Sequence, residues 1–219
     1  MAKAASTRLT ARDWSVLLIV AFCLAGFATL WGPITTPLVD PFHEGEYLST
    51  RMLIGTGMPA PLMIHGSMDY VPANLAALVF GSDQLIAGTR LMNLLFAQFA
   101  AFAFFGALLT LARNRGEALM VMLIGMLVLF WVDERAQTIV ALQQGSPATR
   151  DLALMAGLWA LLAATATTGV KADRLAGLAG LIAGIGWAWA YNRGVILLAA
   201  IPVYAVGAHL AGASRRRQY

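Results

Sequence analysis

The feature of this sequence that most constrains its fold is a series of long apolar stretches separated by short polar segments. A helix needs roughly 20 apolar residues to cross the hydrocarbon core of a bilayer, and slightly shorter stretches can borrow flanking residues. The series therefore predicts an all-α, polytopic membrane protein with about six transmembrane helices, in a single module of residues 1–219. The stretches lie at about residues 14–32, 85–112, 117–132, 152–169, 175–190 and 194–212.

The composition supports this class of protein. The chain is 59% hydrophobic and 12% charged, with a mean hydropathy of +0.72, which leaves too little polar surface to cover a soluble globule. The net charge of +4 is spread over the ends of the apolar stretches, so no basic face for nucleic acid is present. The single cysteine, Cys23, rules out an intrachain disulfide and a thiolate metal cluster.

The basic residues predict how the chain is oriented in the membrane. Ten of the fifteen fall on one side of the expected spans and five on the other. By the positive-inside rule, both termini are cytoplasmic, and the first apolar stretch is a signal anchor of the cytoplasmic (inner) membrane. The inside set is Lys3, Arg8, Arg12, Arg113, Arg115, Lys171, Arg174, Arg215, Arg216 and Arg217, and the outside set is Arg51, Arg90, Arg135, Arg150 and Arg193.

The loops differ greatly in length. The first outer loop, about residues 33–84, is much longer than the expected inner turns at 113–117 and 170–174, and a loop of that length is more often functional than idle. Its residues 44–54 predict a short interfacial helix, and residues 72–80 are apolar but too short to cross the bilayer. Between the last two spans, residues 191–194 predict a tight turn, because Asn and Gly tolerate positive φ.

The most informative polar segment is residues 40–52, at the start of the long outer loop. It contains three carboxylates, an imidazole and a guanidinium. Ionisable groups beside a bilayer are costly to desolvate and usually mark a functional site. The alternative is a polar loop that caps a helix, with Asp40 as the N-cap ahead of Pro41.

The run from His43 to Tyr47 (His-Glu-Gly-Glu-Tyr), followed by Arg51-Met52 and Gly57-x-Pro59, resembles the first extracytoplasmic loop of the GT-C superfamily of membrane glycosyltransferases. It is most similar to the branch that includes protein mannosyltransferases and aminoarabinose transferases, whose loop commonly reads Asp-Glu-Gly-x-Tyr. Looser similarities follow in order along the chain. They are Arg90 at the start of the second span, Ser146-Pro147 and Arg150-Asp151 at the start of the fourth, and the glycine-rich stretch from Gly180 to Arg193.

The sequence departs from that family in two respects. His43 stands where the family has the leading acid of its pair, although Asp40 lies three residues upstream. Family members are also usually more than twice as long, with further spans. The resemblance therefore implies only an N-terminal GT-C module, and a partner subunit that supplies the missing spans is one expectation.

Sugar transfer from a polyprenyl phosphate to a hydroxyl needs a group that takes the acceptor proton and positive charge that stabilises the departing phosphate. Oxygen ligands near the phosphate would also suit Mg²⁺ or Mn²⁺, with Asp40 and Glu44 as candidate ligands. For His65 and Asp69, hydrogen bonding within the loop is the plainer alternative. The catalytic candidates are Asp40, His43, Glu44 and Glu46, and the substrate-binding candidates are Tyr47, Arg51, His65, Asp69, Arg90, Arg150 and Arg193.

Other functional classes have weaker support in the sequence. It contains no nucleophile elbow, zinc-protease helix or phosphate-binding loop. A transporter or lipid scramblase would place charges near the membrane midplane, whereas these spans are almost free of charge. The sequence thus predicts a glycosyltransferase that moves a sugar from a polyprenyl-phosphate donor to an envelope glycan, lipid or protein at the outer face. A transporter, or a non-catalytic subunit of a larger envelope-glycan complex, is the alternative.

Overall fold

The computed structural model describes residues 9–30, 71–81, 84–131, 147–189 and 191–216. Within these ranges every regular element is a helix, which confirms the all-α prediction. The helices are α1 (Ala11–Leu30), α3 (Val71–Phe80), α4 (Leu85–Leu111), α5 (Arg115–Trp131), α7 (Pro147–Thr165), α8 (Val170–Trp189) and α9 (Tyr191–Arg216).

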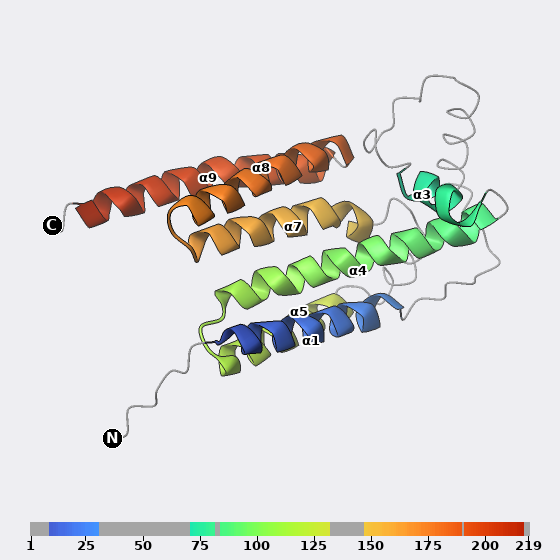
Figure 1. The fold of residues 1–219 in the computed structure, drawn as a ribbon, viewed down its shortest axis with the longest axis horizontal. Coiled ribbons are helices and arrows are strands. Elements are labelled where there is room, and N and C mark those ends of the chain that lie inside the picture. Colours follow the sequence, from blue (N-terminus) through green and yellow to red (C-terminus); the bar gives the residue numbers. More distant parts are fainter. Residues whose placement is uncertain (1–8, 31–70, 82–83, 132–146, 190, 217–219) are drawn as a thin grey trace.

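Helices α4 and α7 pack against each other at the centre of the bundle. On one side α4 contacts α1 and α5, and on the other side α7 contacts α8 and α9 (Figure 1). The two halves also meet through Phe102 of α4 and Trp159 of α7, whose rings lie edge to face with centroids 5.6 Å apart. The result is one bundle of roughly parallel and antiparallel helices with two distinct ends.

The bundle has two ends, which we call the turn end and the α3 end. At the turn end, short connections at residues 112–114 and 166–169 join α4 to α5 and α7 to α8. At the α3 end, α1 and α8 finish, α4, α7 and α9 start, and the short helix α3 packs on the beginning of α4 (Figure 1). This alternation is what the sequence predicts for a chain that crosses back and forth.

The interior of the bundle is built mainly from small residues. Alanines make up most of the buried apolar positions, and Phe105, Leu109 and Leu197 are the large side chains that are fully buried. Many large apolar side chains instead point outward, among them Leu123 of α5 and Val203 of α9. Small residues inside allow helices to approach closely, whereas extended apolar surface outside is unusual for a soluble monomer.

Each of the six predicted apolar stretches coincides with a helix. Within the described ranges, two helices are long and apolar enough to cross a membrane, at Arg90–Leu111 and Arg193–Leu210. Six crossings remain a prediction. The short helix expected at residues 44–54 lies outside the described residues, and residues 72–80 form α3, which at 10 residues is short as expected.

The turns lie elsewhere than the sequence predicted. Residues 191–194 do not form a connecting turn. They are helical and begin α9 at Tyr191, whereas α8 ends at Trp189. Gly194 is needed for close packing, since a Cβ there would lie 2.8 Å from the carbonyl carbon of Gly186. Residues 170–174 likewise belong to α8, because the turn ends at Gly169, which has a φ of 63°. Residues 115–117 begin α5, directly after Asn114.

Candidate functional site

The structure describes only part of the predicted site. Of the predicted site residues, Arg90 and Arg193 are described with their side chains, and both lie at the α3 end. Arg150 lies in the first turn of α7, at the same end, although its side chain is outside the description. The remaining candidates lie outside the described residues, and they are Asp40, His43, Glu44, Glu46, Tyr47, Arg51, His65 and Asp69.

Arg90 is buried in the second turn of α4. Its side chain is 5% exposed, and it is the one buried charged residue among the side chains that the structure describes. A neighbouring glycine helps to explain this crowding, because a Cβ at Gly88 would lie 2.7 Å from the Phe80 ring of α3. Removing a guanidinium from water costs free energy unless polar partners compensate. A buried arginine at this position is therefore more than a solubilising group.

The second polar feature of the α3 end is an ion pair between α7 and α9. Arg193 Nε donates a hydrogen bond to Asp151 Oδ1 over 2.5 Å. Both side chains are partly buried, at 29% and 23% exposure. The pair fixes the orientation of the Arg193 side chain relative to α7.

Glycines position this ion pair. Gly186 of α8 and Gly194 of α9 bring the two helices into backbone contact next to Arg193. A Cβ at Gly186 would also lie 3.1 Å from Ala153 Cβ, so α7 packs closely at the same level. The close approach of these three helices carries Arg193 to Asp151.

Sequence reasoning identified Arg193 but did not assign Asp151 a role of its own. Asp151 appeared only as part of the Arg150-Asp151 pair at the start of a span. The sequence signal for Asp151 is an acid near the start of an apolar helix, at the same expected depth in the membrane as Arg193. Its partner lies 42 residues away in sequence, so no local spacing rule links them.

The segment with the acidic motif is attached to the α3 end at both of its borders. Helix α1 finishes at Leu30 and α3 begins at Val71, and both of these points lie at the α3 end (Figure 1). The described residues on either side of this segment therefore lie at the same end as Arg90, Asp151 and Arg193.

The charged groups of the turn end are organised differently. Thr10 and Asp13 form a capping box at the start of α1, in which the Thr10 N–H donates to Asp13 Oδ2 over 2.8 Å and the Asp13 N–H donates to Thr10 Oγ1 over 3.2 Å. At the start of α5, the Glu117 N–H donates to Asn114 Oδ1 over 3.0 Å, while the Asn114 side-chain amide and the Arg113 N–H donate to the Glu117 carboxylate. Arg115 then bridges the two helices through Asp13, over 2.8 Å.

These bonds also affect the acidity of Asp13. The pKa of its carboxyl lies below the ordinary value of 3.8, first because the backbone N–H and the hydroxyl of Thr10 donate to it, and then because of Arg115. The ionised form is thus favoured by a helix cap. Nothing in this arrangement requires a ligand.

No metal site is evident in the described part of the chain, where no three His, Cys, Asp or Glu side chains cluster. The predicted Mg²⁺ or Mn²⁺ ligands, Asp40 and Glu44, lie outside that part. Chemically, the described groups of the α3 end supply guanidinium charge, which suits phosphate or carboxylate.

Comparison of the chain with models of known protein families, with curated proteins and with solved structures found no match.

Proposed function

We propose that this protein is a membrane glycosyltransferase of the GT-C type that transfers a sugar from a polyprenyl phosphate to an acceptor hydroxyl. In this proposal the six apolar helices cross the cytoplasmic membrane, the turn end faces the cytoplasm and the α3 end faces outward. The outward display of large apolar side chains on α5 and α9 supports a lipid environment. The resemblance of the run from His43 to Tyr47 supports the reaction type.

The observation that carries the proposal is the arrangement of charge at the α3 end. A buried arginine and an interhelical Arg–Asp pair lie at the end of the bundle where α1 ends and α3 begins. In the proposal, these guanidiniums serve the phosphate, and the acidic motif between α1 and α3 in sequence supplies the carboxylate for the acceptor proton. At the turn end, the carboxylates of Asp13 and Glu117 both accept hydrogen bonds at helix starts.

In the proposed reaction, a carboxylate takes the proton of the acceptor hydroxyl as the acceptor oxygen forms a bond to the anomeric carbon. The bond between that carbon and the phosphate oxygen breaks, and its electron pair leaves with the polyprenyl phosphate. Asp40 is the first choice for the base, because His43 replaces the family acid. Arg90 and Arg193 stabilise the departing phosphate, and Asp151 holds Arg193 in place.

The test is sugar transfer from a polyprenyl-phosphate sugar in proteoliposomes that contain the full chain. Asp40→Asn and Glu44→Gln should abolish transfer with folding intact, because a carboxamide cannot accept the proton. Asp13→Asn is the matched control at the turn end and should keep wild-type activity. Equal activity of all four proteins would refute the proposed base.

A further inference from the structure

A cavity of about 530 Å³ lies at the turn end, between the α7–α8 connection and the second half of α9. This volume is in the range that holds a small ligand. The cavity lies on the side of the bundle away from α1 and α5, and at the opposite end from Arg90 and Arg193. Four residues with hydroxyl groups and one carboxylate line it together with small residues, and they are Thr165, Thr167, Thr168, Tyr204 and Asp173.

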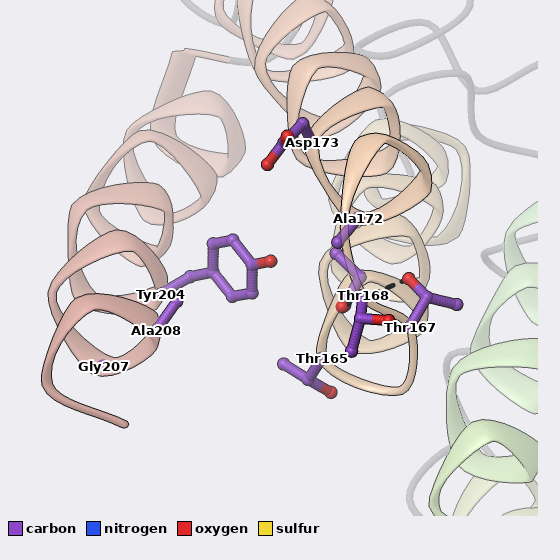
Figure 2. Close-up of a pocket in the computed structure, with 10 residues that line it drawn as sticks. Thr165, Thr167, Thr168, Ala172, Asp173, Tyr204, Gly207 and Ala208 are labelled. Atoms are coloured by element: carbon purple, nitrogen blue, oxygen red, sulfur yellow. Dashed lines mark hydrogen bonds between the residues drawn. The ribbon is translucent and has the colours of Figure 1, made fainter. Parts of the chain in front are cut away.

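The space exists because its walls are made of small residues. Gly207 and Ala208 of α9 face Ala164 and Ala172 across the cavity. A Cβ placed at Gly207 would meet nothing within 4 Å. Tyr204 is the one aromatic residue among the lining residues. Its ring extends from α9 toward the α7–α8 connection, and Asp173 is directed toward the same space from α8 (Figure 2).

Two of the hydroxyls that line the cavity are placed as acceptors. The Thr165 hydroxyl donates to the Leu162 carbonyl over 2.6 Å, and the Thr167 hydroxyl donates to the Ala163 carbonyl over 3.1 Å. Both hydroxyls have therefore used their single proton and offer only lone pairs to a ligand. An ionised carboxylate is also an acceptor only, and the lining contains no Lys, Arg or His.

The charge of the lining points the same way. The carboxylate of Asp173 is the ionisable acid of the cavity, and an aromatic ring within about 6 Å attracts a cation through its face. A phosphate or carboxylate ligand would face Asp173 without a compensating cation in the wall. A ligand with positive charge and several N–H donors fits both the charge and the hydrogen-bonding pattern.

We propose that this cavity binds a primary ammonium group, with Asp173 as counter-ion, Tyr204 as the aromatic wall and the hydroxyls of Thr165 and Thr167 as acceptors. Two sources share this chemistry: the ethanolamine headgroup of a phospholipid and a free small amine. Tyr204 lies within the apolar helix Arg193–Leu210, and Asp173 lies at the start of α8. The cavity thus adjoins both an apolar surface and a polar turn. This inference does not depend on the glycosyltransferase proposal.

The test uses the full chain in nanodiscs of phosphatidylglycerol that contain either phosphatidylethanolamine or phosphatidylcholine, with retained lipid measured by native mass spectrometry. Soluble ethanolamine is titrated separately by calorimetry in phosphatidylglycerol nanodiscs. Wild type should bind at least one of the two ethanolamine probes, and phosphatidylcholine about tenfold more weakly, because a quaternary ammonium has no N–H to donate. Binding of the lipid alone identifies a headgroup site, and binding of soluble ethanolamine identifies a site for free amines.

The variants separate the cavity from general membrane effects. Asp173→Asn and Tyr204→Leu should each weaken binding about tenfold, whereas Asp173→Glu keeps the charge and should retain most of it. Lys171→Gln changes a charge on the same turn outside the cavity and should have no effect. Thermal unfolding of each variant establishes that it is folded. Equal retention of both lipids without ethanolamine binding, or unchanged binding by Asp173→Asn, would overturn the proposal.

Discussion

The bundle contains an arginine–aspartate pair at each end, and the two pairs differ in what surrounds them. At the turn end, Arg115 is 67% exposed, and its partner Asp13, which is 15% exposed, already accepts hydrogen bonds from Thr10. At the α3 end, Arg193 and Asp151 are both partly buried. The two residues are 42 positions apart in sequence, and their hydrogen bond joins α9 to α7. Both pairs join two helices. In the first, the acid is also part of a local helix cap, whereas in the second both side chains are partly buried.

The difference teaches which charges to regard as functional. An ion pair with one exposed partner contributes little to stability, and the helix cap explains Asp13 without a ligand. A partly buried pair and a buried Arg90 are costly to desolvate, so their presence in an apolar bundle indicates a role beyond stability. Charge at the α3 end is therefore the better candidate for a substrate site.

The largest expected effect tests whether close backbone packing holds the α3 end together. Gly194→Ala places a Cβ 2.5 Å from Trp187 Cα, so α8 and α9 must separate. We expect destabilisation of about 1–3 kcal/mol or more, together with loss of the Asp151–Arg193 pair. Thermal unfolding in detergent measures it.

The matched control for that change is Gly184→Ala on α8, where a Cβ meets nothing within 4 Å. This substitution should be neutral or stabilise the helix by up to about 1 kcal/mol. Equal destabilisation by both changes would contradict this explanation, because a Cβ at Gly184 meets no neighbouring atom and Ala has the higher helix propensity.

The next effect concerns the buried arginine. Arg90→Lys keeps the positive charge but removes the planar fork that binds phosphate through two hydrogen bonds. We expect it to cost about 2 kcal/mol of polyprenyl-phosphate binding, measured by titration in nanodiscs. Arg113→Lys, at the exposed turn end, is the control and should bind as wild type does. Wild-type binding by both variants would remove Arg90 from the site.

A smaller effect compares the two ion pairs directly through double-mutant cycles. Asp151→Asn with Arg193→Gln should show a coupling energy for unfolding of about 1–2 kcal/mol, because the pair is partly buried. Asp13→Asn with Arg115→Gln should show a smaller coupling energy, because Arg115 is exposed to solvent. Coupling energies in the reverse order would break the comparison between the two ends.

The smallest effect is a dependence of stability on pH at the turn end. Because the pKa of Asp13 is lowered in the folded protein, the stability it contributes is present above its ordinary pKa of 3.8. That stability is lost as the pH falls through the folded value. Asp13→Asn should therefore reduce the loss of thermal stability between about pH 5 and pH 3.

A further variant separates the two causes of that lowered pKa. Arg115→Gln should keep most of the acid sensitivity, because the hydrogen bonds from Thr10 are the larger cause. Acid sensitivity that disappears with Arg115 alone would show that the ion pair dominates.

The sequence predicted the helices well because hydrophobic runs of this length determine them almost alone. It placed the turns less well. Residues 191–194 look like a turn by composition, yet the structure has them in α9, because Gly194 serves the contact with α8 and not a positive φ. Local propensity cannot distinguish a glycine that permits a turn from one that permits close packing.

The structure describes three of the predicted arginines and none of the predicted acids. Alternation of the spans was enough to place Arg90, Arg150 and Arg193 at one end of the bundle. The burial of Arg90 and the partner of Arg193 depend on contacts between helices that are distant in sequence, so they could not be read from spacing. The acidic motif at residues 40–46 lies outside the described residues and stays a prediction.

The measurement that tests the central claim most directly is the affinity of polyprenyl phosphate for two variants in nanodiscs, Arg193→Gln and Arg115→Gln. Each variant removes one arginine from one Arg–Asp pair, and the two pairs lie at opposite ends of the bundle. The account predicts that Arg193→Gln raises the dissociation constant at least about tenfold, whereas Arg115→Gln leaves it within about twofold of wild type. Equal effects, or a larger effect of Arg115→Gln, would contradict the assignment of the substrate site to the α3 end.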